Sequence, residues 1–139
     1  MPSPELCEQG APPSRLEGMA VSLYQIAIDC HDAAALARFW TRVLDWQIVY
    51  EDPEEIVIGA DPSALPGIVF LTVPETKTVK NRLHIDLTPD DQGAEVERII
   101  ALGARRADVG QGDDITWVVL TDPEGNEFCV LRPKKTLLD

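Results

Sequence analysis

Residues 81–88 have the pattern of a β-strand, with apolar and polar residues alternating from Leu83 to Thr88. The apolar residues fall at every second position, and His84 and Asp86 occupy positions between them. A β-strand sends successive side chains to opposite faces, so both polar side chains should project from the same face, away from the apolar side. The pattern therefore predicts a strand whose polar face is available to a ligand.

Residues 21–30 repeat this pattern, with Ile26 and Ile28 on one face and Gln25 on the other. Apolar residues then recur at spacings of three and four over residues 33–44, and again from about 91 to 102, which predicts an amphipathic helix after each strand. The apolar positions are Leu36, Phe39, Trp40 and Val43 in the first helix, and Val96, Ile99, Ile100 and Leu102 in the second.

Three short strands are predicted after each helix, separated by turns rich in proline, glycine and aspartate. They cover residues 46–51, 55–60 and 67–73 in the first half, and 105–109, 115–121 and 127–132 in the second. The same order of elements thus occurs twice. This predicts an α+β fold of two βαβββ modules, with a concave sheet cavity on one side and the helices outside.

The two halves align at a constant offset of 59 residues, the separation of Gln25 from His84. The same offset relates Phe70 to Cys129. We therefore expect modules at about 21–74 and 80–133 within a single domain of residues 19–139. Residues 1–18, with four prolines and no apolar period, are predicted to be a disordered tail.

Composition narrows the function classes. A formal net charge of −12 disfavours nucleic acid and anionic membrane surfaces as partners, because both require clustered Lys and Arg. Three cysteines without a CxxC spacing form no disulfide framework and favour a reducing, cytoplasmic setting. No apolar run approaches the roughly 20 residues that span a bilayer, and no signal peptide is predicted.

The polar face of each first strand is expected to line the cavity, which places Gln25 and His84 in equivalent positions. The last strands should add Phe70 and Cys129, and Glu127 shares the parity of Cys129. Trp117 is the best aromatic candidate for the pocket wall, although the apolar residues after it leave its face ambiguous. Concave faces of this kind bind small ligands.

The two modules, together with the sequences D-C-H-D-A-A-A-L-A-R-F-W-T-R-V-L-D-W and D-P-E-G-N-E-F-C-V-L, resemble the vicinal oxygen chelate superfamily. That superfamily contains glyoxalase I, bleomycin-resistance proteins and extradiol dioxygenases. The resemblance covers about residues 21–133 and is closest to the small bacterial glyoxalase-like proteins. It implies the fold described above and, for an assembly, a homodimer.

In metal-using members of the superfamily, the first and last strands of each module supply one ligand each. The resemblance carries these positions onto Gln25, Phe70, His84 and Cys129. Gln25 and His84 match residue types that the family uses, whereas Phe70 has no donor atom and Cys129 stands where a glutamate is usual. A divalent ion (zinc, nickel, manganese or iron) on Gln25, His84 and Cys129 is therefore one hypothesis, with Glu127 as a replacement carboxylate.

Three functions stay open from the sequence. The favoured one is metal-free binding of a small organic molecule by Phe70, Trp117, His84 and Asp86. An aromatic side chain at a metal-ligand position cannot coordinate an ion but offers a surface on which a ligand can stack. The second is a metal-dependent lyase, isomerase or dioxygenase. The third uses His84 and Asp86 as acid and base without a metal. Purely structural roles are the alternatives: His84 hydrogen-bonded to Gln25 or Asp86, and Cys129 as a small buried apolar residue.

Overall fold

The computed structural model describes residues 20–107 and 116–139, and within them it contains two four-stranded sheets and two helices. The first module consists of β1 (Gln25–Cys30), α2 (Ala33–Leu44), β2 (Gln47–Glu51), β3 (Glu55–Gly59) and β4 (Gly67–Thr72). The second consists of β5 (Ile85–Leu87), α3 (Gln92–Leu102), β6 (Arg105–Arg106), β7 (Val118–Thr121) and β8 (Glu127–Val130). The predicted tail of residues 1–18 and the strand ends expected at Val109 and Ile115 lie outside the described residues.

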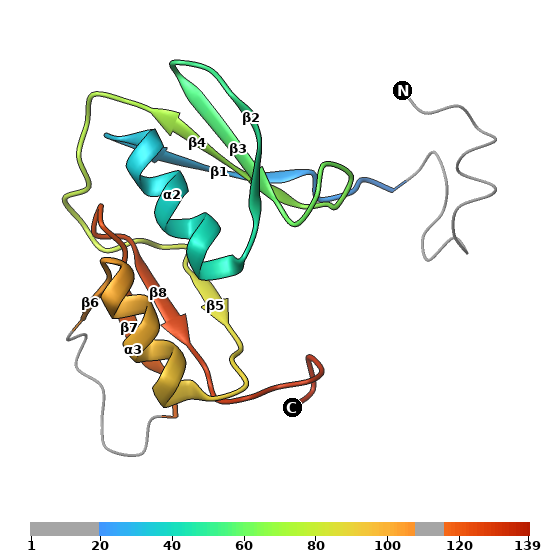
Figure 1. Cartoon of the computed structure of the whole chain (residues 1–139), viewed down its shortest axis with the longest axis vertical. Coiled ribbons are helices and arrows are strands. Elements are labelled where there is room, and N and C mark those ends of the chain that lie inside the picture. Colours follow the sequence, from blue (N-terminus) through green and yellow to red (C-terminus); the bar gives the residue numbers. More distant parts are fainter. Residues whose placement is uncertain (1–19, 108–115) are drawn as a thin grey trace.

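Both sheets have the same topology, which confirms the predicted α+β fold of two βαβββ modules (Figure 1). The strand orders are β1-β4-β3-β2 and β5-β8-β7-β6. In each sheet the first strand pairs in parallel with the last, and the remaining neighbours are antiparallel. The helix that follows each first strand supplies the long crossover that a parallel pair requires.

Local signals set the ends of the helices. The side chain of Asp32 accepts a hydrogen bond from the backbone N–H of Ala35, and Asp91 accepts one from Ala94. These caps satisfy N–H groups that the first turn leaves without a partner. Gly103 ends α3 at φ 129°, a conformation that glycine adopts readily.

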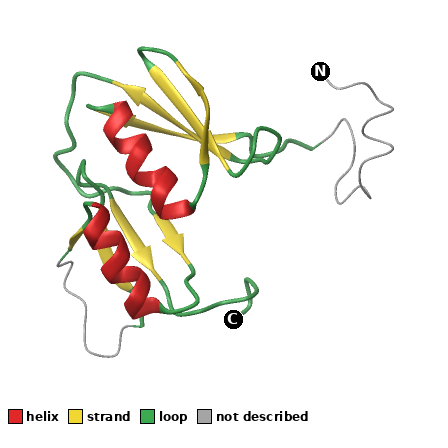
Figure 2. Cartoon of the chain, in the orientation of Figure 1, coloured by secondary structure: helices red, strands yellow, loops and turns green. Residues whose placement is uncertain are grey.

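One hydrophobic core holds the two modules together. Each helix lies across one face of its own sheet (Figure 2), and the predicted apolar stripe of α2 is buried. The Trp40 ring meets Phe128 of β8 with centroids 4.9 Å apart, and Phe39 meets Phe128 at 6.3 Å, both edge to face. Because α2 and β8 belong to different modules, this aromatic cluster joins the two sheets through their helix-facing sides.

The first strand of each module is shorter than its alternating pattern suggested. Strand β1 starts at Gln25 instead of Val21, and β5 contains only Ile85–Leu87 instead of residues 81–88. Each is an edge strand with a single partner, so its length depends on that partner. Leu83, just before β5, is 88% exposed and does not pack against the sheet.

The constant offset of 59 residues fails in the last strands. Ile26 pairs with Ile68 in the first sheet, whereas the equivalent Ile85 pairs with Phe128, which is 60 residues beyond Ile68. The second module therefore has one additional residue before its last strand. Because a one-residue slip moves every side chain of a strand to the opposite face, the residue equivalent to Cys129 is Val69.

The prediction that Phe70 lines the concave cavity is consequently wrong. Phe70 is fully buried among the core residues on the helix-facing side of the sheet. A ring at this position stabilises the core and cannot stack on a ligand in the cavity. Among the described residues, no helix has the length and apolarity needed to cross a membrane.

Candidate functional site

A pocket of about 340 Å³ opens on the concave face of the second sheet. Strands β5, β7 and β8 and the segments next to them provide its walls. The residues that line it are Lys80, His84, Asp86, Trp117, Val119, Glu127, Cys129 and Leu131. The volume lies at the lower end of the range for small-molecule sites.

Strand pairing fixes the floor of this pocket. Cys129 of β8 pairs with Asp86 on one side and with Val119 on the other, so the three side chains form a row across the sheet. Val119 and Cys129 are buried, which gives the pocket an apolar floor. Trp117 lies two residues before Val119, faces the same way, and is 40% exposed at the pocket wall.

His84, Asp86 and Cys129 form a cluster of three potential metal ligands. The Nδ1 atom of His84 lies 3.2 Å from Oδ1 of Asp86, and the donor atoms of all three residues lie within 4.8 Å of one another. The His84 and Asp86 side chains are 41% and 47% exposed, so they can turn without disturbing the core. The donor set, one nitrogen, one oxygen and one sulfur, suits a borderline-soft divalent ion.

The Cys129 thiol is protonated at neutral pH. Burial raises its pKa to about 11, and the nearby charge of Asp86 and a hydrogen bond to that carboxylate act in the same direction. Without an ion, Cys129 is therefore a neutral group of the pocket floor, as the structural interpretation expected.

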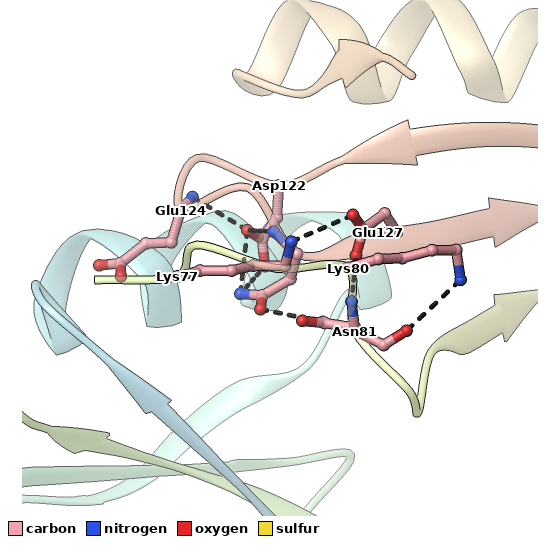
Figure 3. Close-up of polar contacts among 7 residues, drawn as sticks. Lys77, Lys80, Asn81, Asp122, Glu124 and Glu127 are labelled. Carbon is pink, nitrogen blue, oxygen red and sulfur yellow. Dashed lines mark hydrogen bonds and ion pairs between the residues drawn. The ribbon is translucent and has the colours of Figure 1, made fainter. Parts of the chain in front are cut away.

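Glu127 is already engaged by the segment that connects the modules (Figure 3). Its Oε2 accepts a hydrogen bond from Nζ of Lys77 at 3.0 Å, and its Oε1 accepts one from the backbone N–H of Asn81 at 2.9 Å. Burial alone would raise the pKa of Glu127, but the Asn81 N–H and the Lys77 ammonium group outweigh it and hold this pKa below the ordinary value of a glutamate. Because both carboxylate oxygens of Glu127 already accept hydrogen bonds, Glu127 is poorly placed to replace the glutamate ligand that metal-using members of the family have.

Glu127→Gln should lower the free energy of unfolding at pH 7 by about 1 kcal/mol, because it removes the charge from two hydrogen bonds. A carboxylate whose pKa is lowered on folding stabilises the protein above its unfolded-state pKa, and this contribution is lost as the pH falls through the folded-state value. The difference in free energy of unfolding between the two proteins should therefore shrink as the pH falls below the ordinary titration range of a glutamate. Urea unfolding of both proteins at pH 7 and pH 3 measures this difference in the free energy of unfolding. Glu75→Gln, the same charge change at an exposed position of the connecting segment, is the control; an equal effect there would contradict the assignment.

The remaining predicted site residues are not brought together. Gln25 is exposed on β1 of the other sheet, and among the described residues it lines neither of the two pockets that contain His84. Phe70 is in the core. His31, which the sequence did not assign to the site, lies in a separate hollow at the start of α2. The proposed pairing of Gln25 with His84 in one ligand set therefore receives no support from the geometry.

Sequence reasoning did not assign two features of the site. Lys80 reaches the pocket from the connecting segment, and no periodic pattern marks it. Asp86 was assigned to acid–base chemistry but not to metal binding, although its parity with His84 already placed both on one face. The missing information was the pairing of Asp86 with Cys129.

Two open modules of this topology, with a pocket on a concave sheet face, define the class of paired βαβββ proteins. A family model described as "Glyoxalase-like domain" matches residues 25–131, and the chain belongs to this family, within the vicinal oxygen chelate group that the sequence resembles. Among curated proteins, none matches the chain significantly.

Solved structures share the fold at low sequence identity. A glyoxalase/bleomycin resistance protein/dioxygenase family enzyme from Burkholderia phytofirmans is 22% identical, with a TM-score of 0.63 over 82% of this chain and 100% of that one. A mutant of the fosfomycin resistance protein FosX from Listeria monocytogenes, complexed with Mn(II) and 1S,2S-dihydroxypropylphosphonic acid, is 16% identical, with a TM-score of 0.66 over 84% and 93%. The antibiotic binding protein TnmS3 from a Streptomyces species is 15% identical, with a TM-score of 0.59 over 84% and 98%. At these identities the likeness shows the fold alone.

Proposed function

We propose that the protein binds a small organic molecule in the pocket of the second sheet, as a cytoplasmic homodimer. The observation that carries this proposal is the lining of the pocket: an apolar floor of Val119 and Cys129, an indole at the wall, and polar groups at the rim. Small-molecule sites combine these features, with apolar surface for affinity and few polar groups for orientation. That TnmS3 is described as an antibiotic binding protein is consistent with this use of the fold.

The rim indicates which ligands fit. The charge of Glu127 is balanced by Lys77, whereas the carboxylate of Asp86 lies next to the imidazole of His84 and the thiol of Cys129. A flat ligand can stack on Trp117 and direct a hydrogen-bond donor or a cationic group towards Asp86. The ligand class is therefore a small aromatic molecule that carries such a group.

A dimer is part of the proposal because exposed apolar side chains lie on the edge strand β1 and in the segments just before β1 and β5. These are Leu23, Tyr24, Ile26 and Leu83. A second copy could cover them, since exposed sheet edges favour pairing with another chain. The molar mass in solution tests this part, and a monomer at all concentrations would remove it.

Trp117→Ala should weaken ligand binding about tenfold, because an aromatic contact contributes about 1.5 kcal/mol. Chelator-treated protein is screened by thermal shift against small aromatic amines and other aromatic compounds, and the affinity of each hit is then measured by calorimetry. Tyr50→Ala removes an aromatic side chain, 53% exposed, that lines neither this pocket nor the proposed dimer contact, and this variant should bind like the wild type. The proposal fails if no compound raises the melting temperature or if the two variants bind equally.

Metal-dependent chemistry is the second candidate, and the convergence of His84, Asp86 and Cys129 favours it. A divalent ion bound there would polarise an oxygen atom of a substrate. These three residues would hold the ion, and Trp117 and Leu131 line the same pocket. Without an ion, His84 and Asp86 remain the residues for the acid–base alternative, since they are hydrogen-bonded to each other and face the same cavity.

A further inference from the structure

We propose that His84, Asp86 and Cys129 form a zinc-type metal site that contains a thiolate and is built entirely within the second module. The proposal rests on the same pocket as the proposed function and gives that pocket a cofactor class. It differs from the ligand set inferred from sequence, since it excludes Gln25 and the first sheet. Asp86 is the third ligand in place of Gln25 and supplies a carboxylate oxygen.

The backbone already positions the three residues. Asp86 and Cys129 are directly paired across the parallel strands β5 and β8, and His84 precedes Asp86 by two residues on the same face. In a tetrahedral zinc site with bonds of about 2.0–2.3 Å, neighbouring ligand atoms lie about 3.5 Å apart. The donor atoms here already lie within 4.8 Å. Small rotations of the exposed His84 and Asp86 side chains towards the buried Cys129 sulfur would bring the donor atoms to the shorter distance.

The neighbouring carboxylate of Glu127 does not compete for this role. It is held by Lys77 and by the backbone of Asn81, so its oxygens point to the connecting segment. Three protein donors then leave one position open to the pocket, which is the pattern of catalytic zinc sites. Trp117 and Leu131 line the same pocket as the three donors.

The sulfur atom decides the ion class. Thiolates favour zinc and similar borderline-soft ions, whereas magnesium and manganese favour oxygen donors. Binding converts the Cys129 thiol to a thiolate, and its proton passes to the solvent as the sulfur–metal bond forms. Zinc should therefore be retained in the presence of excess manganese.

Cobalt(II) is the probe, because a bound thiolate gives it a charge-transfer absorption and tetrahedral geometry gives it strong visible bands. All proteins, including the reference, carry Cys7→Ser, since Cys7 lies outside the described residues and could contribute a thiolate. We expect one equivalent of cobalt, displaced by zinc but not by excess manganese. Changes outside the ligand shell weaken metal sites about 10–100-fold, so Cys129→Ser and His84→Ala should each weaken cobalt binding at least about 100-fold and remove the thiolate band or the visible bands.

Asp86→Asn tests the third ligand and should also weaken binding. Its matched control is Asp90→Asn, because Asp90 is also exposed and also precedes α3 in the sequence. Cys30→Ala is the control for the loss of a buried thiol. Both controls should keep the cobalt spectrum. Far-ultraviolet circular dichroism of each variant separates loss of ligands from loss of fold.

Three results would overturn the inference: no cobalt or zinc bound by the folded reference protein, a thiolate band that persists in Cys129→Ser, or displacement of zinc by manganese. Ligand binding by chelator-treated protein, with its dependence on Trp117, is measured separately. If metal binding fails while that binding persists, the metal site falls and the proposed function stands. If metal binds and no organic ligand does, the metal site stands and the proposed function falls.

Discussion

Replacing Asp122 with alanine is expected to lower the free energy of unfolding by about 3–5 kcal/mol, the cost of breaking a buried charged network. Asp122 is 3% exposed in the turn between β7 and β8. Its Oδ2 accepts a hydrogen bond from Nε1 of Trp40 at 3.1 Å, and its Oδ1 accepts bonds from the backbone N–H groups of Glu124 and Asn126 at 2.9 and 3.0 Å. Alanine would leave all three donors without this acceptor.

The loss should be large because this carboxylate connects the two modules. Trp40 belongs to α2 of the first module, whereas the turn belongs to the second. Within the same turn, the carboxylate of Glu124 accepts hydrogen bonds from the backbone N–H groups of His31 and Asp32, at 2.7 and 2.6 Å (the turn is shown in Figure 3). Removing Asp122 therefore disturbs the turn and, through it, the start of α2.

Urea unfolding followed by circular dichroism measures this effect. Asp122→Asn keeps the volume and one acceptor oxygen but places an NH₂ group among donors, so about half of the loss should remain. Asp90→Ala, at an exposed position, should change the free energy by less than about 0.5 kcal/mol. A cost below about 1 kcal/mol for Asp122→Ala would show that the network contributes little.

Phe70→Ala should also destabilise the protein by about 3–5 kcal/mol, because it removes a fully buried ring from the shared core and leaves a cavity. The substitution should leave the affinity of any pocket ligand unchanged in the fraction that is folded, since Phe70 points to the helices. Thermal or urea unfolding gives the first quantity, and calorimetry below the melting temperature gives the second.

Val69→Ala is the matched control for strand register. Val69 faces the concave side and loses two methyl groups, which corresponds to about 2 kcal/mol. If Val69→Ala were as destabilising as Phe70→Ala, and if Phe70→Ala abolished ligand binding, the register found here would be contradicted. The constant offset of 59 residues would then hold in the last strand as well.

Local sequence was sufficient for the helices and for the order of elements. The spacing of Leu36, Phe39, Trp40 and Val43 places these side chains on one face whatever the surroundings, and that face became the core. Aspartate at each helix start and Gly103 at the end of α3 act within a few residues, so their roles can be read directly. The shared face of His84 and Asp86 also follows from local sequence, because the two residues are separated by one residue in a strand.

The positions that sequence misplaced depend on pairing between distant strands. Phe70 and Cys129 seemed equivalent by counting, but one additional residue before β8 reversed the face of one relative to the other. The face of Trp117 was ambiguous in an apolar run, and the pairing of Val119 with Cys129 resolved it. Lys80 reached the pocket because the connecting segment is held by Glu127.

The sequence by itself therefore determined the two modules, the helices and the shared face of His84 and Asp86, because these follow from periodicities within a short stretch. Tertiary structure alone decided which side chain of each last strand meets that face, since loop length and strand register set it. For this reason His84, Asp86 and Cys129 lie together, whereas Gln25, predicted in the same metal set, lies on the other sheet. Phe70, predicted at the cavity wall, lies in the core.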